Sequence, residues 1–354
     1  MAIYLKHAEL SMSGSRTLPL VSVIIPHYGG EGILRECLDS LDNTDYTELE
    51  IIVVDNNSSD DSAQIVQNEY PHVQLVQSEY NRGFAGGCNF GSQHAKGKYL
   101  LILNNDTTHV NDWIMRLVQR IESNKNISSV QPKIKDYKQP NYFDYAGGSG
   151  GFMDKYCSPF TRGRVFNTIE KDEGQYDDSC RVFWASGTAF LTKRNIFEQI
   201  GGFDETLFAH MEEIDYHWKC QLIGYEIWVE PKSVVYHHGA RTLPKSSPQK
   251  TYLNYRNSLI LLLTNYDAIK SLKLFFPRFS MEILSLIKEI LIFQWGHALA
   301  IVRAWLWTIF HLGFLYQRRR SLKKTNRVDN IYRKSIVVRY YLMGKKTFIE
   351  LKNG

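Results

Sequence analysis

The chain contains few cysteines, and none of them has the close paired spacing that holds a zinc ion. There are five in 354 residues, an odd number spread widely along the sequence: Cys37, Cys88, Cys157, Cys180 and Cys220. This distribution excludes a disulfide-rich secreted scaffold. We expect reduced thiols inside a cell.

The N-terminal segment lacks the features of a secretory signal. Residues 1–18 carry a lysine and scattered polar side chains, with neither an uninterrupted apolar stretch nor a small-residue cleavage site. We interpret this segment as an extension of a cytoplasmic protein and do not expect export.

A long uninterrupted apolar run is also missing from the C-terminal part. The stretch Ile290–Tyr316 exceeds the roughly 20 residues that a spanning helix needs. Polar residues interrupt it, however: Gln294, His297, Arg303 and His311. Side chains typical of helices at a membrane surface accompany it: Trp295, Trp305, Trp307, Tyr316, Arg318, Arg319 and Arg320. The pattern predicts an apolar helical region, residues 246–320, that lies on a membrane face; an ordinary helical bundle core is the alternative.

Acidic residues are scarce at the C-terminus. From Gln317 onward, twelve Lys and Arg stand against two acids, so this segment carries +10 and the rest of the chain −5 of the net +5. A mildly acidic body with a basic tail, residues 321–354, fits a phosphate-rich surface of anionic lipid or nucleic acid. We favour an anionic membrane surface and no nucleic acid, with a merely solvated tail as the alternative.

The hydrophobic pattern of the first half predicts an α/β fold. Hydrophobic residues make up 44% of the chain, enough for one large domain with an appendage. Short β-branched runs alternate with amphipathic stretches, as in βαβ units. The runs predict strands at Val21–Ile25, Ile51–Val54, Val73–Val76 and Tyr99–Leu103. Their near-continuous apolar character indicates burial on both faces, and therefore a Rossmann-like, mostly parallel sheet.

The middle of the chain is less regular. Residues Gln131–Cys180 are rich in Gly, Tyr and Asp, and we interpret them as long loops. A strand broken at Ser186-Gly187 is predicted at Val182–Thr192. Helices are expected at Lys193–Ile200 and at about Met211–Ile223.

Three stretches end with polar groups that suit a metal-bound phosphate: Ile51–Asp55, Tyr99–Asp106 and Met211–Asp215. In an open α/β sheet, ligands bind beyond the carboxyl ends of the strands. The pattern therefore predicts an enzyme that acts on an activated, phosphate-bearing substrate. A dinucleotide fingerprint of the form G-x-G-x-x-G is not present among Gly83, Gly86, Gly87 and Gly91.

Six ordered sequence blocks give the chain a specific resemblance to a known family. They are Val21–Tyr28, Val53–Asp60, Asn81–Asn89, Leu103–Thr107, Gly201–Asp215 and Tyr236–Gly239. Together they resemble the family 2 glycosyltransferases, in particular their rhamnosyltransferase-like branch, over residues 19–242. The C-terminal helices resemble the tail of bacterial members in composition and in the Arg-rich end.

The resemblance implies a GT-A fold and inverting transfer of a sugar from a nucleotide diphosphate donor. It implies a catalytic domain at residues 19–245, with a nucleotide-sugar half at 19–130 and an acceptor half at 131–245. A proper dinucleotide-binding enzyme or a nucleotidyltransferase on the same sheet is a rival, but the chain has no obvious attacking lysine.

By its position in the family motifs, Asp55 accepts the imide N–H of a uracil or thymine ring. Pro26, His27 and Tyr28 form the same floor, and Arg82 meets the diphosphate in bidentate fashion. A helix cap at Asp55 and a surface salt bridge at Arg82 are the alternatives.

Asn104, Asn105 and Asp106 occupy the place of the family's Asp-x-Asp motif, which holds Mg²⁺ or Mn²⁺ against the diphosphate. Only one carboxylate remains here, so Asn104 and Asn105 are assigned to the nucleotide sugar and Asp106 to the metal. His237 matches the family position that completes the metal shell. A site with little metal dependence, and a packed polar histidine, are the alternatives.

Inversion requires a base that deprotonates the acceptor hydroxyl. By position Glu213 matches the family base, although an aspartate is usual there, and Asp215 is the second candidate. Clustered carboxylates raise one another's pKa, which suits a base near neutrality. Acidic residues favoured at a helix N-terminus are the alternative interpretation.

The acceptor is expected to contact Trp184, Ser186, Gly187 and Glu212, with the indole against a sugar ring. A core tryptophan is the alternative. The sequence thus predicts a metal-assisted transferase that builds a surface glycan on a lipid-linked or saccharide acceptor. We expect it on the cytoplasmic side of the membrane, and an oligomer is possible. Rhamnose from dTDP-rhamnose is the first donor candidate and other UDP or dTDP sugars remain open. A scaffold protein that retains the fold is a further alternative, because of the changes at Asn104 and Glu213.

Overall fold

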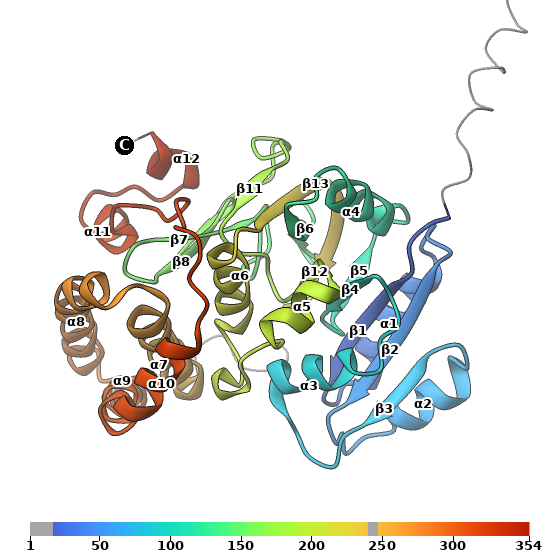
Figure 1. The fold of residues 1–354 in the computed structure, drawn as a ribbon, viewed down its shortest axis with the longest axis horizontal. Coiled ribbons are helices and arrows are strands. Elements are labelled where there is room, and N and C mark those ends of the chain that lie inside the picture. The colour runs from blue at the N-terminus through green and yellow to red at the C-terminus, as the bar shows by residue number, and fades with distance from the viewer. Residues whose placement is uncertain (1–16, 240–246, 354) are drawn as a thin grey trace, which may run out of the picture.

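The structure is a computed structural model that describes residues 17–239 and 247–353 (Figure 1). Most of the predicted N-terminal extension, residues 1–16, therefore lies outside the described residues. The same holds for residues 240–245 of the predicted catalytic domain, for residue 246, and for residue 354.

A mostly parallel sheet forms the centre of the molecule. Its strands, in chain order, are β1 (Val21–His27), β2 (Leu49–Asp55), β3 (Gln74–Gln77), β4 (Tyr99–Leu103), β5 (Thr107–His109), β6 (Ile127–Asp136), β11 (Cys180–Val182), β12 (Ala189–Lys193) and β13 (Glu226–His237). Their spatial order is β11-β13-β6-β12-β4-β1-β2-β3, with β5 beside β13. The strands β4, β1, β2 and β3 pair in parallel, and β12 runs antiparallel between β4 and β6. The predicted α/β fold class is confirmed.

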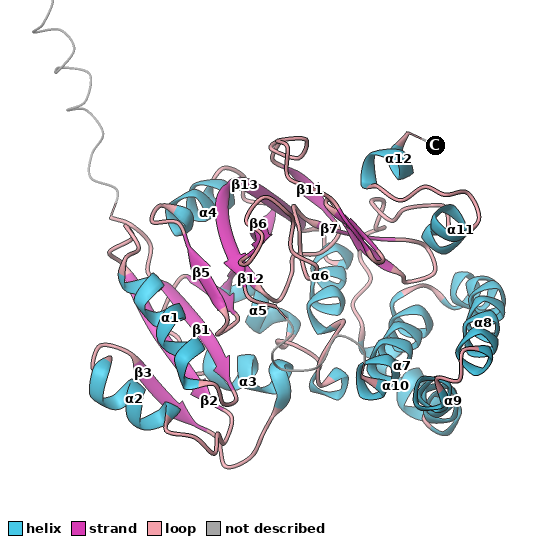
Figure 2. Cartoon of the chain, turned by 180° about the vertical axis from the view of Figure 1, so that it is seen from behind, coloured by secondary structure: helices cyan, strands magenta, loops and turns pink. Residues whose placement is uncertain are grey.

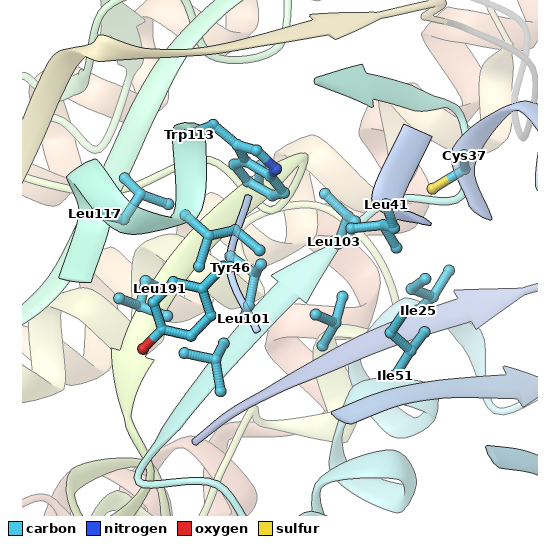
Figure 3. Packing of buried hydrophobic residues seen from close by; sticks show 14 of the residues in the cluster. Ile25, Cys37, Leu41, Tyr46, Ile51, Leu101, Leu103, Trp113, Leu117 and Leu191 are labelled. Atoms are coloured by element: carbon cyan, nitrogen blue, oxygen red, sulfur yellow. The ribbon is translucent and has the colours of Figure 1, made fainter. Parts of the chain in front are cut away.

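Helices cover both faces of this sheet. They are α1 (Glu31–Asp42), α2 (Ser62–Glu69), α3 (Gly83–Ser92), α4 (Trp113–Glu122), α5 (Arg194–Ile200) and α6 (Glu212–Leu222). Because successive strand side chains point to opposite faces, Val23 and Ile25 of β1 pack with α1 and α4, whereas Ile24 packs with α3, α5 and α6. Figure 3 shows the first of these two cores, in which Trp113 and Leu117 of α4 lie near Leu191.

The predicted loop region Gln131–Cys180 contains short strands instead. Four of them form a small antiparallel sheet: β7 (Gly151–Met153), β8 (Pro159–Thr161), β9 (Arg164–Val165) and β10 (Thr168–Ile169). Strands of two or three residues are too short to show an alternating pattern, so the sequence did not predict them. A Cβ atom at Gly151 would lie 2.2 Å from the Trp184 ring, so only glycine permits this sheet to pack there.

The C-terminal helices gather at the end of the molecule away from α2 and β3 (Figures 1 and 2). They are α7 (Pro248–Asn265), α8 (Ala268–Leu291), α9 (Trp295–Phe310), α10 (Leu312–Ser321), α11 (Ile336–Tyr341) and α12 (Phe348–Lys352). In the described part of the chain, no helix alone has the length and apolar character to cross a bilayer; α9 and α10 meet that test only as a pair bent by 69°. One wall of the molecule's main cavity is made by these helices.

Candidate active site

A cavity with a volume of about 820 Å³ lies between the central sheet and the C-terminal helices. Predicted site residues from four separate stretches of sequence line its walls. Those that the sequence singled out are Asn104, Asp106, Trp184, Ser186, Gly187, Glu212, Glu213 and His237. The predicted metal, base and acceptor residues thus share one cavity.

Strand pairing places Asp106 beside His237. Asp106 immediately precedes β5 and His237 ends β13, and these two strands pair antiparallel with His237 opposite Thr107. His237 Nε2 lies 3.1 Å from Asp106 Oδ1, and Nδ1 of the same ring lies 3.0 Å from Asp144 Oδ1. Burial alone would lower the pKa of His237, but the carboxylates of Asp144 and Asp106 raise it to about 10. The imidazolium offsets one of the two negative charges, so the three groups together carry a charge of about −1.

Asp106 and His237 fit a divalent cation, but the protein supplies only these two ligands. Asp106 Oδ1 is buried and makes no well-aligned hydrogen bond in the described part of the chain. Asp144 can accept the Nδ1–H of His237 and so leave Nε2 directed at Asp106, the outer-shell arrangement typical of metal-bound histidine. Residues 17–239 and 247–353 contain no group of three His, Cys, Asp or Glu able to hold a metal. Two protein ligands remain, so diphosphate oxygens and water must supply the others.

Glu213 occupies the first turn of α6, on the cavity wall. Its Oε2 is enclosed by protein atoms and has no hydrogen-bond partner in the described residues. Burial raises the pKa of Glu213 to about 7, although backbone hydrogen bonds, including one from Gly187, act in the opposite direction. Burial, followed by the charge of Glu213, raises the pKa of the neighbouring Glu212 well above its usual value. The pair therefore offers one carboxyl group that ionises near neutrality and one that stays protonated.

Asp215 has a different environment from Glu213. It is fully buried away from the cavity lining, with Oδ1 2.6 Å from Arg318 Nη2 and Oδ2 2.7 Å from Lys219 Nζ. Asn265 Nδ2 also donates to Oδ1, at 2.9 Å. Burial would raise the pKa of Asp215, but Arg318 and Lys219 hold it well below its usual range. Asp215 is thus an ionised structural anchor, and the expectation that neighbouring acids raise its pKa is wrong.

Arg318 belongs to the Arg-rich run that the sequence analysis assigned to a helix at a membrane surface. Its side chain is instead buried, and its Nε also lies 2.8 Å from Asp204 Oδ2. A buried ion-pair network therefore connects α10 to the N-terminal turn of α6. A guanidinium enclosed in this way cannot contribute to a lipid surface.

Replacing Arg318 with Met is expected to destabilise the fold by about 3 kcal/mol, because it leaves a buried carboxylate short of a partner. The depressed pKa of Asp215 contributes stability that is present above its unfolded value near 4 and is lost as pH falls toward the folded value. The difference in the free energy of unfolding between Arg318→Met and the parent protein should therefore become smaller below about pH 4. Urea unfolding of both proteins at several pH values measures this difference. Arg320→Met, at an exposed neighbour, is the control and should change stability by less than about 0.5 kcal/mol.

The loop before α6 is held from the C-terminal helices. Phe208, His210 and Met211 all have positive φ angles, of 61°, 66° and 74°, which non-glycine residues rarely adopt. Asn257 of α7 donates to the carbonyl oxygens of Leu207, Ala209 and His210, at 3.0, 3.1 and 2.7 Å. This strained loop sets the position of Glu213, and nothing local in the sequence indicates the role of α7.

The predicted nucleotide residues lie at the carboxyl ends of β1 and β2, beside the cavity. His27 is paired with Asp55 across the two strands, and the Asn105 amide lies 2.7 Å from His27 Nδ1. Burial lowers the pKa of His27, which favours the neutral ring. Asp55 Oδ1 accepts from the backbone N–H of Ser58 at 2.9 Å, and Tyr28 is exposed. Pro26, His27, Tyr28, Asp55 and Asn105 are not part of the cavity lining but adjoin it through Asn104.

Arg82 is not brought into the cavity. Its guanidinium lies over the rings of Tyr80 and Phe90, 4.6 and 4.5 Å from their centroids, and its Nε donates to Ser78 Oγ. Arg82 does not line the cavity, and its contact with a diphosphate stays a prediction.

Two predicted acceptor residues are fixed by backbone contacts. Trp184 Nε1 donates to the carbonyl oxygen of Phe152 at 2.9 Å, and Ser186 Oγ donates to that of Ala146 at 3.2 Å. Both are almost completely buried, yet both line the cavity. They form a part of the cavity wall that backbone contacts hold in place.

Comparison with known proteins identifies the family. The sequence model of Glycosyl transferase family 2 matches residues 22–201, just over half of the chain. The chain belongs to this family. The predicted resemblance is confirmed, and this family 2 glycosyltransferase is a sugar-transferring enzyme.

Curated relatives include transferases of different sugars. The chain is 24% identical over 264 residues to an N-acetylglucosaminyl-diphospho-decaprenol L-rhamnosyltransferase of Mycobacterium tuberculosis, which covers 71% of this chain and 85% of the relative. It is 26% identical to the rhamnosyltransferase WbbL of Escherichia coli, over 71% of this chain and 98% of the relative. A GalNAc(5)-diNAcBac-PP-undecaprenol beta-1,3-glucosyltransferase of Campylobacter jejuni is 32% identical, over 55% of this chain and 60% of that protein.

Solved structures share the fold. GalNAc-T7 with UDP, GalNAc and Mn²⁺ has a TM-score of 0.55 at 19% identity, over 70% of this chain and 48% of that one. Residues 1–349 of Staphylococcus aureus TarS have a TM-score of 0.52 at 22% identity, over 80% of each chain. Because both identities are low, these likenesses show the fold alone. That fold is the GT-A architecture expected of the family 2 domain.

Proposed function

We propose that the enzyme is an inverting, metal-assisted transferase that moves a sugar from a UDP or dTDP donor to a saccharide acceptor. Rhamnose from dTDP-rhamnose is the first candidate, because two of the relatives are rhamnosyltransferases. The observation that carries the proposal is the shared cavity, in which the Asp106 and His237 pair and the carboxyl group of Glu213 line the walls.

In the proposed mechanism, Glu213 accepts the proton of an acceptor hydroxyl as its oxygen attacks the anomeric carbon. The new C–O bond forms on the face opposite the bond to the diphosphate, which breaks as the nucleotide leaves. Asp106 and His237 would hold Mn²⁺ or Mg²⁺, which when bound neutralises charge on the leaving diphosphate. Asp144 keeps the His237 ring oriented, and the Trp184 wall positions the acceptor sugar.

A panel of nucleotide sugars tests this function. The purified protein is incubated with UDP, dTDP and GDP sugars and Mn²⁺, and release of the nucleoside diphosphate is followed with and without membranes carrying acceptors. Release from one UDP or dTDP sugar supports the proposal. Lack of release from every sugar under both conditions would favour a scaffold that retains the fold.

The activity is expected to rise with pH through neutrality. Glu213 must be ionised to accept a proton, and burial raises its pKa to about 7. The turnover rate should therefore fall about tenfold per pH unit below that value and level off above it. A pH profile of kcat at saturating donor and acceptor measures this, and a flat profile between pH 5.5 and 8, over which the ionised fraction rises roughly 30-fold, would exclude Glu213 as the base.

We further propose that the acceptor is carried on a lipid and that the enzyme binds peripherally to the cytoplasmic membrane face. The names of two relatives place a diphosphate-linked polyprenol on the acceptor side. Large apolar side chains on α8, α9 and the turn between them are strongly exposed: Leu272, Phe276, Leu284, Ile287, Leu291, Phe293, Trp295, Leu299, Ile309 and Phe310. An apolar surface of this extent favours contact with lipid. We call these ten residues the apolar face.

Substituting Phe293 and Phe310 together with Glu should detach the enzyme from vesicles. The two rings are 76% and 79% exposed, so the fold loses little, whereas burial of each in lipid contributes about 2 kcal/mol. The partition coefficient onto anionic vesicles should fall by more than about tenfold in a flotation assay. Tyr80→Glu, at an exposed ring between β3 and α3, is the control and should leave flotation unchanged. A parent protein that does not float with anionic vesicles would contradict the proposal.

A further inference from the structure

The cavity extends well beyond the residues that the proposed transfer uses. Past Asp144, its lining continues along β9 and the first turns of α7, and then along α8 and α11. The residues of this distal part include Tyr145, Arg164, Lys250, Leu284, Val338, Tyr341 and Leu342. A saccharide that reaches Glu213 would leave this part of the cavity unfilled.

Two cations at the middle of the cavity lack acidic partners. Arg164 and Lys250 lie over the same Tyr145 ring, 4.4 and 5.6 Å from its centroid, so the two charges are at most about 10 Å apart. Among the described residues, neither has a carboxylate at ion-pair distance. Arg164 is only 9% exposed and its Nε makes no hydrogen bond there, although a buried guanidinium normally binds an anion. The unpaired Arg164 Nε and the nearby ammonium group of Lys250 favour an anionic ligand.

The outer end of the cavity is apolar and continuous with the apolar face. Leu284 belongs to both, and Tyr341 and Leu342 beside it are 61% and 81% exposed. Phe166 connects the two ends, because its carbonyl oxygen lies 3.5 Å from Arg164 Nη1 and its ring contacts that of Tyr341. A ligand that binds along this path must be anionic in the middle and apolar at its outer end.

We propose that Arg164, Lys250 and the apolar rim of α8 and α11 form a subsite for the diphosphate and first carbons of a lipid-linked acceptor. The diphosphate lies between the two cations, and the apolar chain passes over Leu284 and Leu342 toward the membrane. The acceptor sugar is thereby directed at Glu213. This assignment rests on the proposed function, for which it specifies how the acceptor is recognised.

Farnesyl diphosphate, an isoprenoid diphosphate without a sugar, is a direct probe. Binding is measured by isothermal titration calorimetry at probe concentrations below those at which farnesyl diphosphate forms micelles. EDTA in the buffer excludes binding through a metal. The full chain should bind farnesyl diphosphate at least tenfold more tightly than either farnesol or inorganic pyrophosphate. Lys250→Met should weaken binding of farnesyl diphosphate by about tenfold and leave that of farnesol unchanged. Lys232→Met, at an exposed lysine on β13, is the matched control and should change neither.

Two further variants separate the subsite from a folding defect and from the donor site. Arg164→Lys keeps a positive charge at the buried position and should bind farnesyl diphosphate with intermediate affinity. The double variant Leu284→Ser with Leu342→Ser should bind farnesyl diphosphate more weakly, with unchanged affinity for pyrophosphate. UDP with Mn²⁺ should not displace the probe. Equal affinity for farnesyl diphosphate and farnesol, or displacement by UDP, would overturn the subsite. Nucleotide-sugar cleavage is measured without any lipid, so it tests the proposed function separately.

Discussion

Replacing Glu213 with Gln is expected to reduce the rate of sugar transfer by about 10²–10⁴-fold, because the amide cannot accept the acceptor proton. The change keeps the size of the side chain and removes only one ionisable oxygen. Binding of UDP or dTDP should persist, since the nucleotide residues lie at β1, β2 and β4. Rate measurements at saturating donor, with nucleotide affinity measured by calorimetry, test both expectations.

Glu212→Gln is the matched control for this variant. Glu212 lies next to Glu213 on the same turn and is protonated near neutrality, because burial raises its pKa well above the usual value. Its amide is therefore close to the native group in charge and shape, and the loss in rate should be far smaller. Transfer that persists in Glu213→Gln would assign the base to another group. Asp215→Asn would then be the next variant, although its ion pairs with Arg318 and Lys219 indicate a loss of stability instead.

Replacing Asp106 with Asn is expected to reduce transfer by about 10²–10³-fold, as removal of several kcal/mol of charge stabilisation on the leaving diphosphate predicts. Asp106 is the only carboxylate of its motif, and Asn104 and Asn105 cannot replace its charge. Because a direct ligand is lost, higher Mn²⁺ concentrations should not restore the rate. Steady-state rates over a range of Mn²⁺, with Mn²⁺ binding followed by electron paramagnetic resonance, measure the effect.

Asp144→Asn provides a graded comparison. Asp144 contacts His237 Nδ1 and does not belong to the proposed metal ligands, so its loss should weaken Mn²⁺ binding by about 10–100-fold. Saturating Mn²⁺ should then recover most of the rate. If Asp106→Asn and Asp144→Asn both lose all transfer activity at every Mn²⁺ concentration, the carboxylates of Asp106 and Asp144 act structurally. An Asp106→Asn enzyme with full activity would exclude the proposed cation site.

The sequence indicated several residues of the candidate site because their signals are local. Asp55 ends β2 and Asp106 comes shortly after β4, and parallel strands bring their carboxyl ends to one edge of the sheet. Glu213 was proposed in the same way, from a short acidic block at a helix start. The apolar runs likewise indicated the buried parallel strands of the nucleotide half.

Long-range contacts could not be predicted in this way. The ion pair between Asp215 and Arg318 joins α6 to α10, and no spacing or periodicity indicates that a residue of an Arg-rich run is buried. Asp144 lies in a region without regular pattern, so its contact with His237 had no signal. The Asn257 contacts to the loop before α6 depend on how α7 packs. Residues of the C-terminal helices thus line the cavity of the candidate site, in addition to the proposed membrane contact.

The central claim is that one cavity holds the diphosphate and its cation close to the base. The most direct measurement is a crystal structure with UDP or dTDP and Mn²⁺, with diffraction data collected at the manganese edge. The account predicts an anomalous peak bound by the carboxylate of Asp106 and by His237 Nε2, at roughly 2.0–2.3 Å, in contact with the diphosphate and with Glu213 across the cavity. Ordered nucleotide with the manganese peak away from Asp106 and His237, or with Glu213 on a wall that the diphosphate does not face, would contradict it.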